Sequence, residues 1–206
     1  VKPKDQPALT TEHFIKSDED IDRYMSLPFE AEDYDISGVL ELERNLGDAG
    51  MVYVRYADPM HDAAVLFDFN DFAVRCITDM APVLRLIDFQ FERIKAGLAN
   101  LLAACRGRSF LFYTGGPEIC TPPMMPPRVF GRIVTPYQKR LIQMIHEAGM
   151  YASLHCHGKV RAVLDEILAC GFDSLEPIEP QPQGDMTLAE LFDRADGRLC
   201  LIGHIQ

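Results

Sequence analysis

The chain has 206 residues, of which 48% are hydrophobic and 25% are charged, and this length is enough to bury one hydrophobic core. Its 20 basic and 31 acidic residues give a net charge of −11 without a cluster of Lys and Arg, which argues against a nucleic-acid-binding surface. No apolar run approaches the roughly 18 residues that span a bilayer, so we predict a soluble cytoplasmic protein without a membrane or nucleic-acid partner.

The N-terminal part of the chain is polar and contains two predicted helices. The first lies within residues 16–28, where Ser17 is a suitable N-cap and Asp20 completes a capping box. The second lies within residues 35–47, "DISGVLELERNLG". Helical periodicity then dominates the next part of the chain, and residues 82–105 form the longest predicted helix.

Helices that end on glycine alternate with short, apolar, β-leaning segments through the rest of the chain. Gly149, Gly171 and Gly197 each follow a helix and precede such a segment. Glycine suits the left-handed position after a helix, and the alternation indicates parallel strands joined by crossover helices. The predicted strands are residues 51–56, 108–113, 150–155, 173–176 and 199–203.

This pattern predicts an α/β fold of the (β/α)8 TIM-barrel family, with residues 1–206 as a single domain. A complete barrel usually needs about 250 residues, so we expect the chain to cover only the central part, incomplete at both ends. The chain starts on Val1 and ends on the strand-like "LCLIGHIQ", which we interpret as a segment of a longer polypeptide. An open remnant exposes apolar strand edges, so we expect it to form a homodimer or to belong to a longer chain.

Residues that bind ligands in parallel α/β folds follow the carboxyl ends of the strands. In this chain these positions hold four of the six histidines and three isolated glutamates, whereas the opposite strand ends hold glycine and ordinary loop residues. This asymmetry predicts an active site. In the order of the strands, the residues are Asp58 and His61, Glu118, His155 and His157, Glu176 and Glu179, and His204 and Gln206.

His155 and His157, in "SLHCHGK", are the first candidates for a metal site. If the strand geometry continues through them, both imidazoles face one way and Cys156 faces the other. Two neutral imidazoles suit zinc, and a histidine pair that binds substrate or bonds within itself is the alternative. Gly158 would let the next helix begin close to the ion. The other cysteines are scattered without a Cys-x-x-Cys motif and are interpreted as reduced core thiols.

Two glutamates are candidate catalytic residues. Glu118 lies between Gly-Pro and a proline-rich loop, where it is a metal ligand, a general acid or base, or an exposed glutamate on a stiff loop. Glu176 ends the fourth predicted strand and is the better candidate of the two acids in "SLEPIEPQPQGD", with Glu179 in a supporting position. Thr187 and Glu190 are expected only to cap the next helix.

Several motifs in the second half of the chain resemble the uroporphyrinogen decarboxylase superfamily, in that family's order. They are the helix "TPYQKRLIQMIHEAG", the His-x-(Cys/His)-Gly strand end at 155–158, the Gly-x-Asp turn at 171–173 and the ending "GHIQ", which replaces the family's Gly-Asn-Ile/Leu-Asp. The resemblance is strong over residues 118–206 and weaker over 10–117. It implies a (β/α)8 barrel that is longer than this chain.

The superfamily includes zinc-dependent, corrinoid-linked methyltransferases, whose His-x-Cys-Gly motif binds the zinc. His155 matches the histidine of that motif and His157 replaces its cysteine. The resemblance therefore implies zinc on His155 and His157, with Glu118 or Glu176 as a further ligand or general base. It also implies methyl transfer between a small-molecule donor or acceptor and a corrinoid carried by a partner protein. Imidazole in place of a thiolate makes the metal more electrophilic, which favours a substrate other than a thiol.

Two alternatives stay open. One is tetrapyrrole decarboxylation without a metal, as in the uroporphyrinogen decarboxylases of haem synthesis, with the histidines as proton donors to the ring carbon. The net charge of −11 argues mildly against so acidic a substrate, although the arginines that bind it in the family precede the region matched here. The other alternative is a non-catalytic barrel that binds a corrinoid or a tetrapyrrole.

Overall fold

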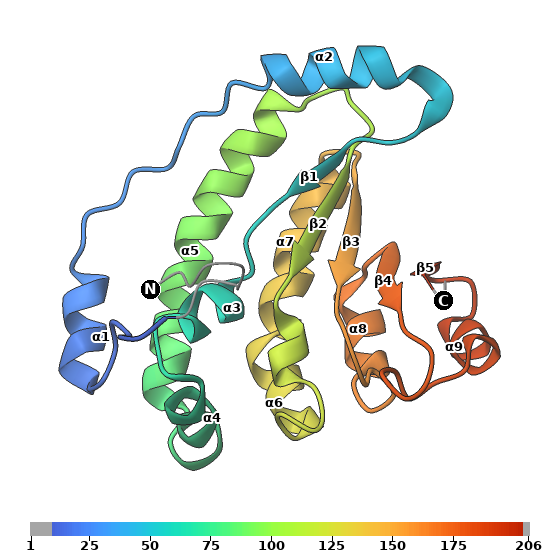
Figure 1. Ribbon diagram of the computed structural model, residues 1–206. Helices are drawn as coiled ribbons and strands as arrows, with labels where there is room; N and C mark the ends of the chain where they lie inside the picture. Colours follow the sequence, from blue (N-terminus) through green and yellow to red (C-terminus); the bar gives the residue numbers. More distant parts are fainter. Residues whose placement is uncertain (1–9, 204–206) are drawn as a thin grey trace.

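The computed structural model of the protein describes residues 10–203. Its centre is a parallel sheet of five strands in the order β1-β2-β3-β4-β5, so each strand lies beside its neighbour in the sequence (Figure 1). Parallel neighbours need crossover connections, and each connection here contains at least one α-helix. The strands are β1 (Tyr53–Arg55), β2 (Leu111–Gly115), β3 (Tyr151–His155), β4 (Ser174–Ile178) and β5 (Cys200–Gly203).

The helices alternate with the strands after β1, as the glycine pattern predicted. Figure 1 shows the two longest, α5 and α7, running beside the strands. The α-helices are α1 (Asp18–Met25), α2 (Ser37–Leu46), α3 (Pro59–Ala64), α4 (Phe69–Thr78), α5 (Ala81–Ala104), α6 (Pro127–Ile133), α7 (Thr135–Glu147), α8 (Leu164–Cys170) and α9 (Leu188–Ala195), and the 3-10 turns are η1 (Gly47–Ala49) and η2 (Pro117–Cys120).

The helix ends follow local signals in the sequence. Ser17 N-caps α1, and its own N–H donates to the Asp20 carboxylate at 3.0 Å. Thr187 and Glu190 form the same capping box at the start of α9, as predicted. Gly171 ends α8 in the left-handed conformation, with φ of 91°. Local hydrogen bonds and backbone preferences therefore explain where these helices begin and end.

The second strand differs from its predicted bounds of 108–113. The Arg108 N–H still donates to the Cys105 carbonyl at 3.1 Å, in the turn that ends α5. β2 therefore begins at Leu111 and continues to Gly115, which pairs with the end of β3. The pairing partner, which lies far away in the sequence, sets these bounds, and so the local pattern placed the strand too early.

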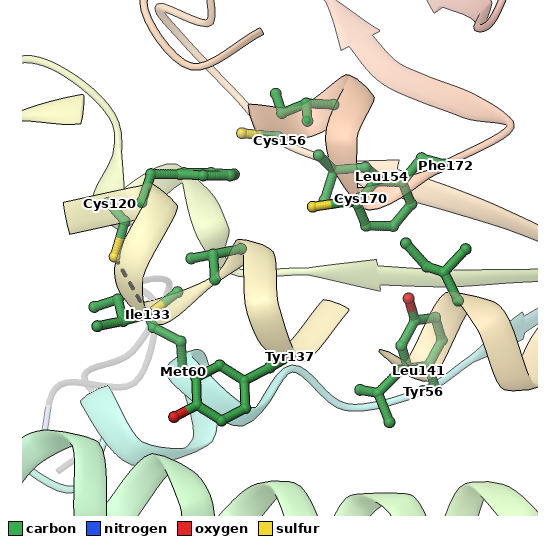
Figure 2. Packing of buried hydrophobic residues seen from close by; sticks show 14 of the residues in the cluster. Tyr56, Met60, Cys120, Ile133, Tyr137, Leu141, Leu154, Cys156, Cys170 and Phe172 are labelled. Carbon is green, nitrogen blue, oxygen red and sulfur yellow. Dashed lines mark hydrogen bonds between the residues drawn. The ribbon is translucent and has the colours of Figure 1, made fainter. Parts of the chain in front are cut away.

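The two faces of the sheet have different surroundings. On one face, Phe112, Ala152 and Leu154 are fully buried within the hydrophobic core. Figure 2 shows this core between β3 and the helices α6, α7 and α8, with side chains of Leu141 and Phe172 among those packed in it. Because neighbouring residues of a strand point to opposite faces, the alternate residues face away from this core. These alternate residues carry the candidate site.

The sheet is open over the part of the chain that the structure describes. Within residues 10–203, β1 pairs only with β2, and β5 pairs only with β4. A closed barrel is therefore not formed by these residues, and the architecture is an α/β fold with a five-stranded parallel sheet in sequential order. None of the helices within these residues is both long enough and apolar enough to cross a membrane.

Candidate functional site

The site lies where the carboxyl ends of β2, β3 and β4 meet. The strand register places Gly115, His155 and Glu176 side by side, so their side-chain positions lie on the same face of the sheet. This face borders an open cleft of about 680 Å³. The residues that line the cleft are Tyr53, Arg55, His61, Tyr113, Gly115, Gly116, Glu118, His155 and Glu176.

His155 and His157 lie next to each other at the end of β3. Their ring centroids are 4.7 Å apart and their planes make an angle of 81°. Both side chains are accessible, with exposed fractions of 35% for His155 and 51% for His157. Cys156 between them is buried in the core, and this burial raises the pKa of its thiol. Strand alternation predicted this opposition of two imidazoles and one thiol.

Each imidazole of the pair has its own carboxylate. Nδ1 of His155 lies 3.2 Å from Oε1 of Glu176, and Nδ1 of His157 lies 3.2 Å from Oε1 of Glu179. No protein atom of residues 10–203 forms a hydrogen bond with Nε2 of either ring in this structure. A carboxylate that accepts a hydrogen bond from one ring N–H of a neutral imidazole leaves the other ring nitrogen with a free lone pair, and this is the usual orientation of metal-binding histidines.

Glu179 also binds the backbone after the histidine pair. Its Oε2 accepts a hydrogen bond from the Gly158 N–H at 2.6 Å. Although burial raises the pKa of Glu179, the Gly158 N–H and the His157 imidazole outweigh it, and the pKa lies below the ordinary value. Gly158 was expected to let the next helix begin close to a bound ion, but α8 begins only at Leu164. The role of Gly158 is instead to hold Glu179 beside His157.

Glu118 lines the same cleft from the turn η2. Its Oε2 accepts a hydrogen bond from the Gly116 N–H at 2.9 Å, which ties the carboxylate to the end of β2. Within residues 10–203, no three His, Cys, Asp or Glu side chains converge closely enough to hold a metal ion by themselves. The structure therefore brings His155 and His157 together and keeps Glu118 in the same cleft as His155, without joining it to the pair.

His61 lines the same cleft and belongs to α3, the helix that follows β1. A Cβ atom on Gly116 would lie only 2.5 Å from the His61 ring, and one on Gly115 would lie 3.3 Å from the His155 ring. The imidazole of His155 thus packs against Gly115, and the imidazole of His61 packs against Gly116. Interaction with Asp62 raises the pKa of His61, although burial opposes the rise. His61 was noted in the sequence as a strand-end residue but was not assigned a role.

A buried polar network holds the start of α3. Asp58 accepts a hydrogen bond from the His61 N–H at 2.7 Å and another from the Gln138 amide of α7. The Tyr56 hydroxyl donates to Oε1 of the same glutamine at 2.9 Å. Burial raises the pKa of Asp58 to about 6, although these donors oppose the rise. The contact between Asp58 and Gln138 could not be predicted locally, because the two residues lie 80 positions apart.

The remaining strand-end and histidine candidates lie elsewhere. His146 is on the surface of α7, where its Nε2 lies 2.8 Å from Oδ2 of Asp173. Asp173 precedes β4, so this pair marks the opposite end of the sheet from the cleft. His204 and Gln206, which follow the fifth strand, lie outside the described residues.

No family model matches the chain, and no curated protein matches it either. Among solved structures, a methyltransferase from Methanosarcina mazei superposes with a TM-score of 0.63 at 16% sequence identity. The match covers 79% of this chain and 45% of that protein, so the chain spans less than half the length of the methyltransferase. At this identity the likeness shows a shared fold.

Proposed function

We propose that the chain forms an arc of a (β/α)8 barrel of the uroporphyrinogen decarboxylase superfamily and that it supports metal-assisted methyl transfer. The sequential order of the strands and the position of the cleft at their carboxyl ends both suit such a barrel. The fold shared with the Methanosarcina mazei methyltransferase supports the choice of reaction. The small-molecule donor or acceptor would exchange its methyl group with a corrinoid on a partner protein.

The observation that carries the proposal is the pair of imidazoles that are each oriented by a carboxylate. Glu176 and Glu179 hold Nδ1 of His155 and His157, so both Nε2 atoms have a lone pair for a metal ion. These donors fit zinc, with further positions left for a third ligand and for substrate. Zinc bound there supplies a Lewis acid that lowers the pKa of a substrate heteroatom.

The other acidic residues of the cleft would handle the proton. Glu176 is engaged with His155, whereas one oxygen of Glu118 accepts only a backbone N–H and the residue is partly exposed. Glu118 is therefore the better general base, which takes the proton when a substrate heteroatom becomes a methyl acceptor. Glu118 remains a candidate for the third metal ligand as well, because it lines the same cleft as His155.

Metal content tests the proposal directly. We expect the purified chain to bind about one zinc ion at pH 7.5 by mass spectrometry, and cobalt(II) to give a visible spectrum of a low-coordinate site. The double variant His155→Ala/His157→Ala should bind neither ion. His146→Ala is the matched control, because His146 also has a carboxylate partner but lies at the other end of the sheet.

Two further arms separate the roles of the site residues. Glu176→Gln should weaken zinc affinity by about 10- to 100-fold in a chelator competition, because the imidazole loses its orienting carboxylate. Transfer from methylcobalamin to a panel of phenols, thiols and amines should require the zinc-loaded chain. A wild-type chain that binds no zinc at neutral pH would sink the proposal, and loss of carboxyl groups from uroporphyrinogen would point to decarboxylation instead.

A further inference from the structure

Arg55 occupies a central place on the β1 side of the cleft. It ends β1, is exposed, and pairs in register with Tyr113 of β2. Arg55 also lines a second cleft, of about 700 Å³, which extends between β1 and α5. The two clefts share Arg55, His61 and Gly115, so they meet at this point.

The charge of Arg55 has no counter-ion among the described residues. Other arginines of the chain form ion pairs, such as Arg75 with Asp18 and Arg194 with Asp165, whereas Arg55 forms none within residues 10–203. The two acidic residues of the cleft that holds His155 already have donors, because Glu118 accepts the Gly116 N–H and Glu176 faces His155. An exposed guanidinium without a partner in a concave site is available to a ligand.

The metal would change the charge balance around Arg55. Without a metal, three glutamates at or beside the histidine pair, Glu118, Glu176 and Glu179, outnumber the one arginine of the cleft. A divalent cation on the histidine pair would offset the two excess negative charges. Arg55 would then offer a positive charge at the side of the cleft away from the metal, where an anion can bind without displacing the metal's own ligands.

Two tyrosines flank Arg55 on the same face of the sheet. Tyr53 lies two residues before Arg55, and Tyr113 is its register partner. Their ring centroids are 5.7 Å apart with an angle of 49° between the planes. Both rings line the cleft, and they offer an angled apolar wall beside the guanidinium.

We propose that Arg55 and His61 form an anion subsite that binds the carboxylate of a small organic acid. This inference rests on the proposed function and names its substrate class. The apolar part of the acid packs on Tyr53 and Tyr113, and its other end reaches the histidine pair. β1 and β3 lie on either side of β2, about 10 Å apart at the backbone, and the open cleft extends from Arg55 to His155.

The guanidinium suits this role for a geometric reason. Its planar fork donates two parallel N–H bonds to the two oxygens of a carboxylate, whereas a lysine offers a single point charge. His61 adds a donor from α3, on the same side of the cleft. The subsite therefore selects a carboxylate over a neutral amide of the same shape.

Calorimetry on the zinc-loaded chain tests the subsite with benzoate and with its neutral isostere benzamide. Benzoate should bind at least tenfold more tightly than benzamide. The variant Arg55→Gln should lose at least tenfold in benzoate affinity with no change for benzamide, and Arg55→Lys should fall between the two. Arg44→Gln is the matched control, because Arg44 is an exposed arginine of α2 that lines neither cleft.

The results separate the two proposals. If the wild-type chain binds no zinc, the proposed function fails, and the charge argument fails with it. If zinc binds but benzoate affinity is equal in the wild type and in Arg55→Gln, benzoate binds the metal directly. That result refutes the anion subsite and leaves the proposed function standing. His61→Asn should weaken benzoate binding while zinc content stays at the wild-type value, and a loss of zinc would show that His61 is a metal ligand instead.

Discussion

Asp58 connects three parts of the molecule through one buried side chain. Its carboxylate caps α3 through the His61 N–H, accepts the Gln138 amide of α7, and through that amide is linked to Tyr56 at the end of β1. Ionising a carboxyl group in the core is costly, and these donors only partly offset the cost. The position of His61 therefore depends on Asp58, although Asp58 does not line the cleft that holds His155.

Asp58→Asn should change how stability depends on pH. The folded-state pKa of Asp58 is about 6 against an ordinary value of 3.8, which corresponds to an unfavourable term of about 3 kcal/mol once the group is ionised. The sign follows from the raised pKa: wild-type stability falls as the pH rises from about 4 to 6, and the loss then stays constant. Asparagine keeps the N-cap and removes this loss.

Urea unfolding at pH 4 and pH 7 measures the effect. From pH 4 to pH 7, the unfolding free energy of Asp58→Asn should increase relative to that of the wild type by up to about 3 kcal/mol. Other titrating groups are common to both proteins and cancel in the difference. A difference that is independent of pH would show that folding does not raise the pKa of Asp58.

At the scale of elements, the turn after β2 and the start of α3 must fit closely together. Gly116 has φ of 121°, which side-chain-bearing residues rarely adopt, and a Cβ atom there would meet the His61 ring. The Gly116 N–H also holds Glu118. This glycine therefore lets two functional candidates from different elements approach one point of the sheet.

Gly116→Ala should be destabilising and should also disturb the cleft. Strain at the positive φ costs about 1–3 kcal/mol, and the clash with His61 adds roughly 1–3 kcal/mol in urea unfolding. Gly107→Ala is the control, because Gly107 has φ of 78° but open space around its Cβ position, so only strain applies. Equal destabilisation in the two variants would mean that His61 moves away freely. Benzoate binding should weaken in Gly116→Ala and stay unchanged in Gly107→Ala.

At the scale of the whole molecule, the open sheet leaves apolar surface exposed. Tyr53 and Tyr151 are exposed by 42% and 48%, and both belong to strands of the sheet. A net charge of −11 keeps copies of the chain apart by repulsion at neutral pH. Homodimer formation through the strand edges stays a prediction. Pairing of the exposed edges favours the dimer, and charge repulsion between the two copies opposes it.

The chain should associate most strongly where its net charge vanishes. Static light scattering at low ionic strength should rise as the pH falls from 7.5 towards the isoelectric point near 4.9 and should fall again below it. At pH 7.5, added salt should promote association, because it screens the repulsion. A flat scattering profile across this range would show that the exposed strand surface does not drive association.

The sequence alone determined the elements of the fold and half of the candidate site. Helices ending on glycine, short apolar segments and capping boxes act within a few residues, and so the five strands, the α5 helix and the caps at Ser17 and Thr187 could be predicted. The opposition of His155 and His157 to Cys156 could also be predicted, because alternation along a strand is a local rule.

The close contacts within and beneath the cleft depend on the tertiary structure. His61 lies against Gly116, Asp58 binds Gln138 and Arg55 lines the cleft with His155, and each of these pairs is joined by packing and strand register. No periodicity records such contacts, because they form between residues tens of positions apart once the sheet is assembled. The same reason explains the late start of β2, whose bounds depend on its pairing with β3.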